Sequence, residues 1–139
     1  MSTYIPVLLR QHILALEQGR CAYCQSPEAL MGVTFEIEHI LPLSAGGETV
    51  LTNLCLSCPT CNRYKSTRLT AHDPENNAEV PLFHPRQQAW PANFAWNVDA
   101  TEVLGLTPTG RATIIALHIN RPVMLQLRRY WSVLNLHPR

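Results

Sequence analysis

Apolar residues at helical spacing dominate the first part of the chain. In the segment 6–18 (PVLLRQHILALEQ) they recur at intervals that place most of them on one helical face. Gly19 follows directly, and glycine is a residue type that commonly ends helices. The pattern therefore predicts an N-terminal helix that ends near Gly19 and buries one side.

An alternating pattern comes next. Residues 33–41 (VTFEIEHIL) alternate β-branched or aromatic side chains with acids, as a half-buried strand does. Gly46-Gly47 forms a turn before the apolar segment 50–56, which we expect to pair with the first strand. Pro59 suits a first helical turn, so we predict a helix from there to about residue 69.

The second half of the chain predicts a connection, a hairpin and two helices. Its prolines between residues 70 and 91 favour an extended connection along the surface. The alternating segment 93–98 and the segment 102–106 are expected to form the hairpin. Thr107-Pro108 is a cap followed by a first-turn proline, which predicts a helix to about residue 119. A last helix is expected to end near Leu136.

Composition favours one compact α+β domain. The 139 residues are 46% hydrophobic and 15% charged, which is enough for one core and too little to suggest two. No apolar run approaches the roughly 18 residues of a membrane span, and the N-terminus lacks the pattern of a secretory signal. We therefore expect a single domain over residues 1–139, without a membrane segment and located in the cytoplasm.

The formal net charge of +1 averages over an asymmetry along the chain. Residues 1–48 contain five acids and two arginines, whereas residues 49–72 contain three basic residues and no acid. After Glu102 there are five arginines and again no acid. Such basic stretches can follow phosphates even in a nearly neutral protein. Arginines that merely solvate helix faces explain the pattern equally well.

Four of the five cysteines form two C-x-x-C pairs, Cys21/Cys24 and Cys58/Cys61, separated by 33 residues. Each pair can supply two thiolates from one tight turn, and zinc prefers four of them in a tetrahedron. Four protein ligands leave no open coordination position, so we expect a structural zinc ion in a reducing compartment. Two alternatives remain: Cys55/Cys58 is also a C-x-x-C pair, and the cysteines can be unliganded core residues.

The residues between and beside these pairs form a second pattern, FEIEHILPLSAGGETVLTNLCLSCPTCNRYK. It combines Glu38-His39, a loop with Pro and Gly-Gly, Asn53, and a C-x-x-C-N-x-x-K run that ends at Lys65. This combination closely resembles the HNH endonuclease family. The resemblance implies a small ββα-metal core over residues 21–69, stabilised by the four-cysteine zinc site, with residues 70–139 as a C-terminal extension.

The resemblance and the chemistry of the side chains together suggest roles in phosphodiester hydrolysis. An imidazole with a pKa of about 6.5 can take a proton from water at neutral pH, so His39 is the expected general base. Glu38 and Asn62 offer oxygen donors that suit one Mg2+ or Mn2+ ion, and the resemblance places metal ligands at both positions. Glu36 is a weaker candidate for the same ion. Asn53, the middle residue of the motif, is expected to tie the loop by hydrogen bonds and so orient His39.

Basic residues near Asn62 are candidates for contact with DNA. Lys65 lies one helical turn after Asn62, where it could meet a phosphate oxygen. Arg63 and Arg68 are weaker candidates for the same contact. The sequence also departs from the commonest family pattern, because Glu38 replaces a frequent aspartate and Asn62 a frequent histidine. Both residues keep oxygen donors, which favours Mg2+ or Mn2+ over a second zinc ion.

The leading interpretation is a DNA endonuclease whose products carry 5′-phosphate and 3′-hydroxyl ends, as the resemblance implies. The alternative is a catalytically silent, zinc-stabilised module that binds nucleic acid, although such a module needs no general base at His39. A third interpretation is a zinc domain that binds another protein through its aromatic residues: Trp90, Phe94, Trp96 and Trp131. The lack of a second recognition domain indicates low sequence specificity or a protein partner that directs the enzyme.

Overall fold

The chain folds into two compact units of an α+β protein. The computed structural model describes residues 4–138. Unit 1 contains the residues up to Leu69 and the segment His84–Gln88, and unit 2 contains Thr70–Phe83 and the residues from Ala89 onward. One domain was expected from the chain length. The contacts between residues fall into two groups because the apolar residues of the C-terminal extension pack among themselves. The division at Leu69 coincides with the predicted end of the ββα-metal core.

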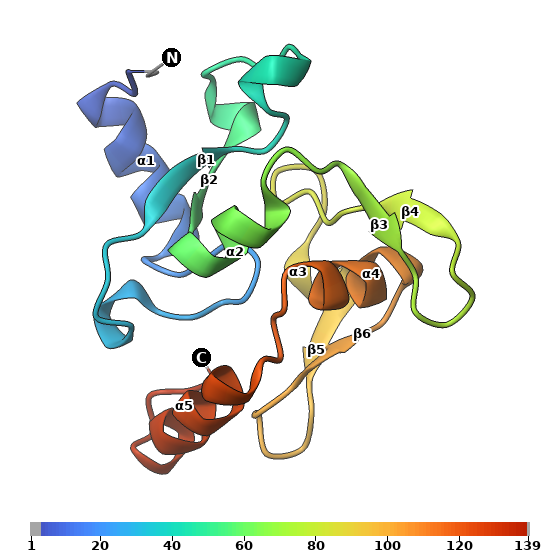
Figure 1. Cartoon of the computed structure of the whole chain (residues 1–139). Coiled ribbons are helices and arrows are strands. Elements are labelled where there is room, and N and C mark those ends of the chain that lie inside the picture. The colour runs from blue at the N-terminus through green and yellow to red at the C-terminus, as the bar shows by residue number, and fades with distance from the viewer. Residues whose placement is uncertain (1–3, 139) are drawn as a thin grey trace. The chain divides into compact units, whose positions relative to one another are not determined.

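Unit 1 is built on a short antiparallel hairpin with a helix against each strand (Figure 1). Strand β1 (Glu36–His39) pairs with β2 (Leu54–Ser57). Helix α1 (Val7–Glu17) packs against β2, and α2 (Pro59–Lys65) packs against β1. The predicted hairpin and both helices are confirmed, although each strand is shorter than its apolar pattern. Three 3-10 helices lie in the loops: η1 (Glu28–Leu30), η2 (Leu43–Ala45) and η3 (Leu51–Asn53).

The core of unit 1 surrounds β2. All four residues of this strand are buried, so β2 has no solvent face. Ile13 is the one fully buried residue of α1, and it joins Phe35 and Leu54 in the core. The predicted apolar face of α1 is only partly used, because Val7 and Leu8 are exposed. The hairpin is thus fixed mainly through β2, which holds β1 and its polar residues against α2.

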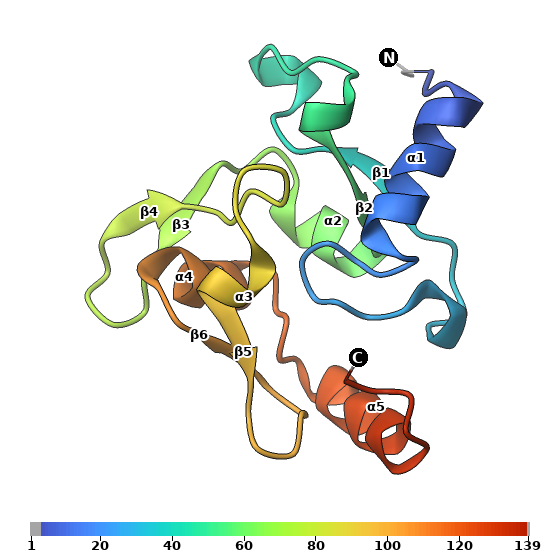
Figure 2. The same cartoon turned by 180° about the vertical axis from the view of Figure 1, so that it is seen from behind.

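Unit 2 contains two more hairpins and three helices (Figure 2). The elements are β3 (Thr70–His72), β4 (Glu79–Pro81), α3 (Trp90–Asn93), β5 (Phe94–Trp96), β6 (Val103–Gly105), α4 (Pro108–Ala116) and α5 (Pro122–Val133). The predicted hairpin appears as β5–β6 and the two predicted helices as α4 and α5. The Thr107 side chain caps α4 by accepting a hydrogen bond from the backbone N–H of Gly110 at 3.0 Å.

The structure corrects one sequence-based expectation for unit 2 and gives no support to the third functional interpretation. The segment after residue 70 is more than an extended connection, because β3 and β4 pair as a hairpin. The four aromatic residues proposed as a protein-binding surface pack with one another or in the core. Phe94 is 1% and Trp131 5% exposed, and the ring of Trp90 lies 5.1 Å from that of Phe94 and 5.6 Å from that of Trp96.

Several arginines of unit 2 are bound within the protein. Arg111 makes two hydrogen bonds to the carboxylate of Asp73, at 3.0 and 2.8 Å. Arg128 is fully buried and donates to the carbonyls of Thr101 and Ile119. Two of the five arginines that follow Glu102 are therefore engaged within unit 2. Among residues 4–138, no helix has the length and apolarity that crossing a membrane would require.

Candidate active site and metal centre

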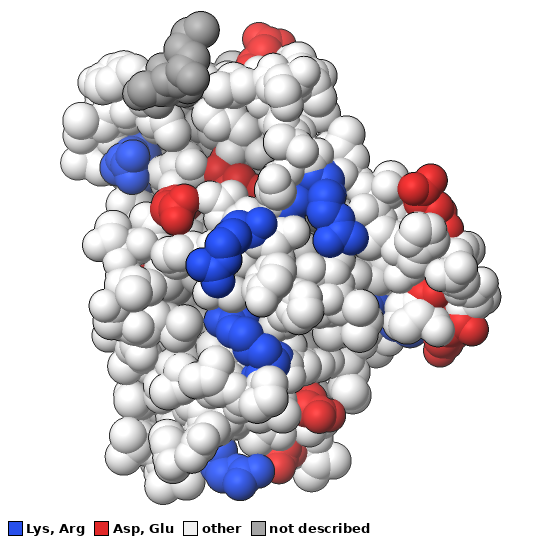
Figure 3. Space-filling model, viewed as in Figure 1, with Lys and Arg blue, Asp and Glu red and all other residues white. Residues whose placement is uncertain are grey.

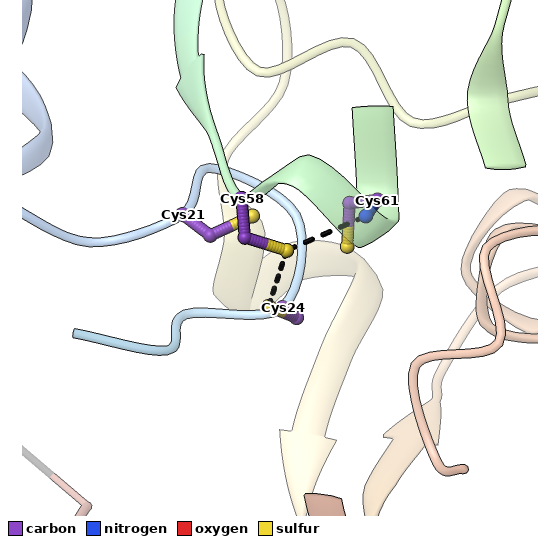
Figure 4. Close-up of side chains that lie close together, drawn as sticks. All are labelled: Cys21, Cys24, Cys58 and Cys61. Atoms are coloured by element: carbon purple, nitrogen blue, oxygen red, sulfur yellow. Dashed lines mark hydrogen bonds between the residues drawn. The ribbon is translucent and has the colours of Figure 1, made fainter. Parts of the chain in front are cut away.

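Four cysteine side chains from two separate turns meet in unit 1 (Figure 4). The sulfur atoms of Cys21, Cys24, Cys58 and Cys61 all lie within 4.8 Å of one another, and all four residues are fully buried. The sulfurs of Cys24 and Cys58 are 3.9 Å apart. Tetrahedral zinc with Zn–S bonds of about 2.3 Å places its sulfurs roughly 3.8 Å apart. The cluster therefore fits a structural zinc ion, as the spacing of the cysteines predicted.

Backbone contacts fix the two cysteine turns. The backbone N–H of Ala22, inside the first turn, donates to the carbonyl of Leu56 in β2 at 2.8 Å. Cys58 is the N-cap of α2, and its sulfur accepts a hydrogen bond from the backbone N–H of Cys61 at 3.4 Å. An ion held by both turns ties the loop after α1 to the start of α2. The zinc site thus supports the strands and the helix that carry the polar residues of the second motif.

Cys55 lies outside this cluster. It stands opposite Glu38 in the β1–β2 register, and its sulfur is 3.4 Å from Oε2 of that residue. The four-sulfur cluster consists of the other cysteines. The alternative pair Cys55/Cys58 is therefore excluded, and Cys58/Cys61 is confirmed as the second half of the site.

Glu38 takes part in a buried network between β1 and α2. Its Oε2 accepts a hydrogen bond from the hydroxyl of Tyr23 at 2.8 Å, and its Oε1 lies 2.9 Å from Nζ of Lys65. The residue is only 5% exposed. Burial raises the pKa of Glu38, while Lys65, Tyr23 and Cys55 oppose this effect. The negative charge of Glu38 therefore depends strongly on the ammonium group of Lys65.

The position of Lys65 differs from the predicted one. Its spacing from Asn62 suggested an exposed contact with phosphate, but Lys65 is 1% exposed and its Nζ also donates to the carbonyl of Ile40 at 2.9 Å. The expectation assumed that this face of α2 is open to solvent. The face packs against β1 instead, so Lys65 supports Glu38 from inside unit 1.

His39 ends β1 and has a half-buried imidazole ring. Its Nε2 lies 2.9 Å from Oγ1 of Thr49. Partial burial lowers the pKa of His39 below its ordinary value because it disfavours the charged ring. The ring is therefore neutral at neutral pH, as a general base must be before it accepts a proton.

Asn62 projects from α2 toward Glu36, the first residue of β1. Its Nδ2 donates to Oε2 of Glu36 at 2.7 Å. An ionised carboxylate only accepts hydrogen bonds, so this contact turns the amide nitrogen toward Glu36 and the amide oxygen away from it. Glu36 thus orients the oxygen of Asn62.

An open hollow in the surface of unit 1 brings three of the predicted residues together. Glu38, His39 and Asn62 all line it. Its other lining residues come from β1, from the loop after it and from the end of α2: Ile37, Pro42, Leu43, Ser44, Ser66 and Thr67. Consecutive residues of a straight strand face opposite sides. Glu38 and His39 can border one hollow because β1 ends at His39 and the chain turns away toward Pro42.

Asn53 does not line this hollow but fastens the loop between β1 and β2. Its Oδ1 accepts a hydrogen bond from the backbone N–H of Leu41 at 2.8 Å. Its Nδ2 donates to the carbonyls of Leu41, at 3.0 Å, and Glu48, at 2.9 Å. These are side-chain-to-backbone bonds of the predicted kind. The orientation of His39 by Asn53 stays a prediction.

Arg63 and Arg68 are exposed on and after α2. The guanidinium of Arg63 lies 5.7 Å from the ring centre of Tyr64, a cation–π contact on the same helix. Figure 3 shows basic side chains over the region of α2, with acidic side chains close by. Both arginines therefore remain candidates for contact with a phosphate backbone.

Sequence reasoning missed three residues of the site: Tyr23, Cys55 and Thr49. A strand register that places Cys55 opposite Glu38 was the one signal that could have indicated their contact. Tyr23 and Thr49 approach the motif only through the folded loops, and no local pattern marks them. The contacts of Tyr23 and Thr49 therefore could not be predicted from the sequence.

The comparisons with known proteins agree with this geometry. The family model for HNH endonuclease matches residues 21–68, which include both cysteine pairs and all the residues that line the hollow. No curated protein matches the chain.

Proposed function

We propose that the protein is a metal-dependent endonuclease that hydrolyses phosphodiester bonds in DNA, in agreement with the match of the HNH endonuclease family model to residues 21–68. The observation that carries this proposal is the hollow lined by Glu38, His39 and Asn62. It combines a neutral imidazole with two oxygen-bearing side chains, of which that of Glu38 is largely buried. Hydrolysis needs a base for the attacking water and positive charge at the phosphate, and these residues can provide or hold both.

The residues of the hollow fit one hard divalent ion. Oε1 of Glu38 is buried and lies 2.9 Å from Nζ of Lys65, so an ion bound there would take the place of this ion pair. The amide oxygen of Asn62 is turned away from Glu36. We propose that these two oxygens hold Mg2+ or Mn2+, with water as the remaining ligand. When bound, such an ion stabilises negative charge on the phosphate and the leaving oxygen.

His39 is the proposed general base. Its imidazole takes one proton from the attacking water, whose oxygen forms a new bond to phosphorus. The bond between phosphorus and the 3′ oxygen breaks, and the leaving oxygen receives a proton from solvent. This yields a 5′-phosphate and a 3′-hydroxyl end, as expected for the family. Glu38 and Asn62 would hold the divalent ion beside the phosphate, and Arg63 and Arg68 are proposed to bind the neighbouring backbone.

One observation favours the second candidate, a catalytically silent module that binds nucleic acid. The carboxylate of Glu38 is buried and ion-paired with Lys65. Such a pair can stabilise the fold without taking part in catalysis. A wild-type protein that binds DNA but does not hydrolyse it would have this second function. For either function, a protein partner that directs the chain to its target and a cytoplasmic location remain predictions.

Cleavage of supercoiled plasmid tests the proposal. Purified protein is incubated with Mg2+, with Mn2+ and with a chelator, beside His39→Ala and His72→Ala. His72 is an exposed histidine of β3 in unit 2 and serves as the matched control. We expect nicked or linear DNA with at least one ion, a large loss of rate in His39→Ala and wild-type rate in His72→Ala. Absence of cleavage by the wild-type protein with both ions contradicts the endonuclease proposal.

A further inference from the structure

The contact between His39 and Thr49 decides which ring nitrogen is available for catalysis. Nε2 of His39 lies 2.9 Å from Oγ1 of Thr49, so this nitrogen already has a hydrogen-bond partner within the protein. In the part of the chain that the structure describes, no hydrogen bond to Nδ1 of His39 is seen. A general base must present a free lone pair to water. Of the two nitrogens, only Nδ1 meets that condition.

The loop that carries Thr49 is built to hold it in place. The side chain of Asn53 binds the backbone of Leu41, two residues after His39, and the carbonyl of Glu48, directly before Thr49. The same amide therefore ties both ends of the His39–Thr49 contact. Gly47 allows the close approach, because a Cβ there would lie 1.8 Å from the carbonyl oxygen of Leu41 and 2.9 Å from Nδ2 of Asn53.

We propose that Thr49 is a positioning residue that accepts a hydrogen bond from Nε2–H of His39 and keeps the lone pair on Nδ1. This inference rests on the proposed hydrolysis and names a further residue of that site. The direction of the bond follows from the reaction. Once Nδ1 has taken the proton of water, both ring nitrogens are donors. A threonine oxygen that accepts keeps its bond in that state and binds the charged ring more strongly.

The opposite direction would work against catalysis. If the hydroxyl of Thr49 donated to Nε2, the neutral ring would carry its proton on Nδ1, and Nδ1 could not accept one from water. The bond would also be lost whenever the ring became charged, because Nε2 would then be a donor facing a donor. The hydrogen bond therefore gains strength as the proton is transferred only when Thr49 accepts it.

Three variants of the full chain test this role. Thr49→Val removes the acceptor and keeps the shape, Thr49→Ser keeps the hydroxyl, and Thr52→Val alters an exposed threonine of the same loop. We expect Thr49→Val to lower the maximal cleavage rate by about 10- to 100-fold, the range for a hydrogen bond to a charged group. DNA affinity should stay within about twofold. Thr49→Ser should recover most of the rate and Thr52→Val should keep all of it.

Either of two kinetic results would overturn the proposal. One is an unchanged maximal rate in Thr49→Val. The other is a folded Thr49→Ser that is as slow as Thr49→Val, because the hydroxyl would then not be the group that matters. Thermal unfolding of each variant shows whether a loss of rate merely reflects a loss of fold.

The protonated nitrogen of the neutral ring gives a readout that does not need cleavage. Long-range 15N–1H spectra of the wild-type protein, with the His39 signals identified by their absence in His39→Ala, should show the proton on Nε2. A proton on Nδ1 would overturn the inference. If the wild-type protein cleaves no DNA, the proposed function fails, and these spectra still decide the direction of the hydrogen bond separately.

Discussion

Glu38 is a buried carboxylate whose charge relies on one lysine. Lys65→Met should leave this charge without its partner and destabilise unit 1 by about 3–5 kcal/mol, the usual cost of breaking a buried ion pair from one side. Urea unfolding followed by circular dichroism measures the change. The double variant Glu38→Gln/Lys65→Met should recover much of the loss, because no charge remains buried. A Lys65→Met protein within about 1 kcal/mol of wild type would show that the pair is not structural.

Individual residues show which parts of the candidate site could be predicted from the sequence and which could not. The zinc ligands were predictable because each pair is a local turn whose spacing alone identifies its chemistry. His39, Glu38 and Asn62 were found from a motif, and the hollow brings them together. The partners Tyr23 and Thr49 were not found, because they reach the motif through tertiary folding. Lys65 was predicted to be exposed because helical spacing determines which residues share a face of the helix. It does not determine which element packs against that face.

At the scale of elements, patterns with caps and clear periodicity predicted the fold well. The cap at Thr107 set the start of α4, and alternation identified the β5–β6 hairpin. The β3–β4 hairpin was missed because its strands have only three residues each, too few to show a period of two, and β4 ends in Pro81. Short strands paired with each other depend on their packing partner, here α4, more than on their own sequence.

The exposed arginines on and after helix α2 lead to a prediction about DNA binding. Arg63 lies on its exposed side, and Arg68 follows shortly after its end. If each contacts a phosphate, Arg63→Ala and Arg68→Ala should each weaken DNA binding and reduce the slope of log K against log salt by about 1. Fluorescence anisotropy over a series of salt concentrations measures both quantities. Arg10→Ala, which removes an exposed arginine from α1, is the control and should change neither. An unaltered slope in Arg63→Ala would remove α2 from the DNA interface.

At the scale of the whole molecule, part of the positive charge in the C-terminal part of the sequence is engaged inside the fold. The arginines after Glu102 looked like a phosphate-binding stretch, yet Arg111 is engaged by Asp73 and Arg128 is buried. Both arginines make these contacts within unit 2. The sequence could not reveal this, because Asp73 lies far from Arg111 along the chain. The acceptors of Arg128 are two backbone carbonyls and the side-chain oxygen of Asn120. Net charge along a chain describes composition, whereas an interface requires exposed charges side by side.

The division into two units gives a prediction about metal removal. All four zinc ligands belong to unit 1, and a structural zinc site contributes directly to the free energy of folding of the unit that contains it. A strong chelator should therefore lower the unfolding temperature of unit 1 and leave unit 2 nearly unchanged. Hydrogen exchange read by mass spectrometry should show lost protection in β1, β2 and α2 but kept protection in α4 and α5.

Cys61→Ser should reproduce the effect of the chelator without any added reagent, because three thiolates bind zinc more weakly than four. Cys55→Ser is the matched control, since Cys55 is buried in the same unit but lies outside the sulfur cluster. Metal analysis should find one zinc per chain in the control and a loss of zinc in Cys61→Ser. Equal loss of protection in both units would mean that they unfold together, and the zinc site would then stabilise the whole chain rather than the candidate nuclease unit alone.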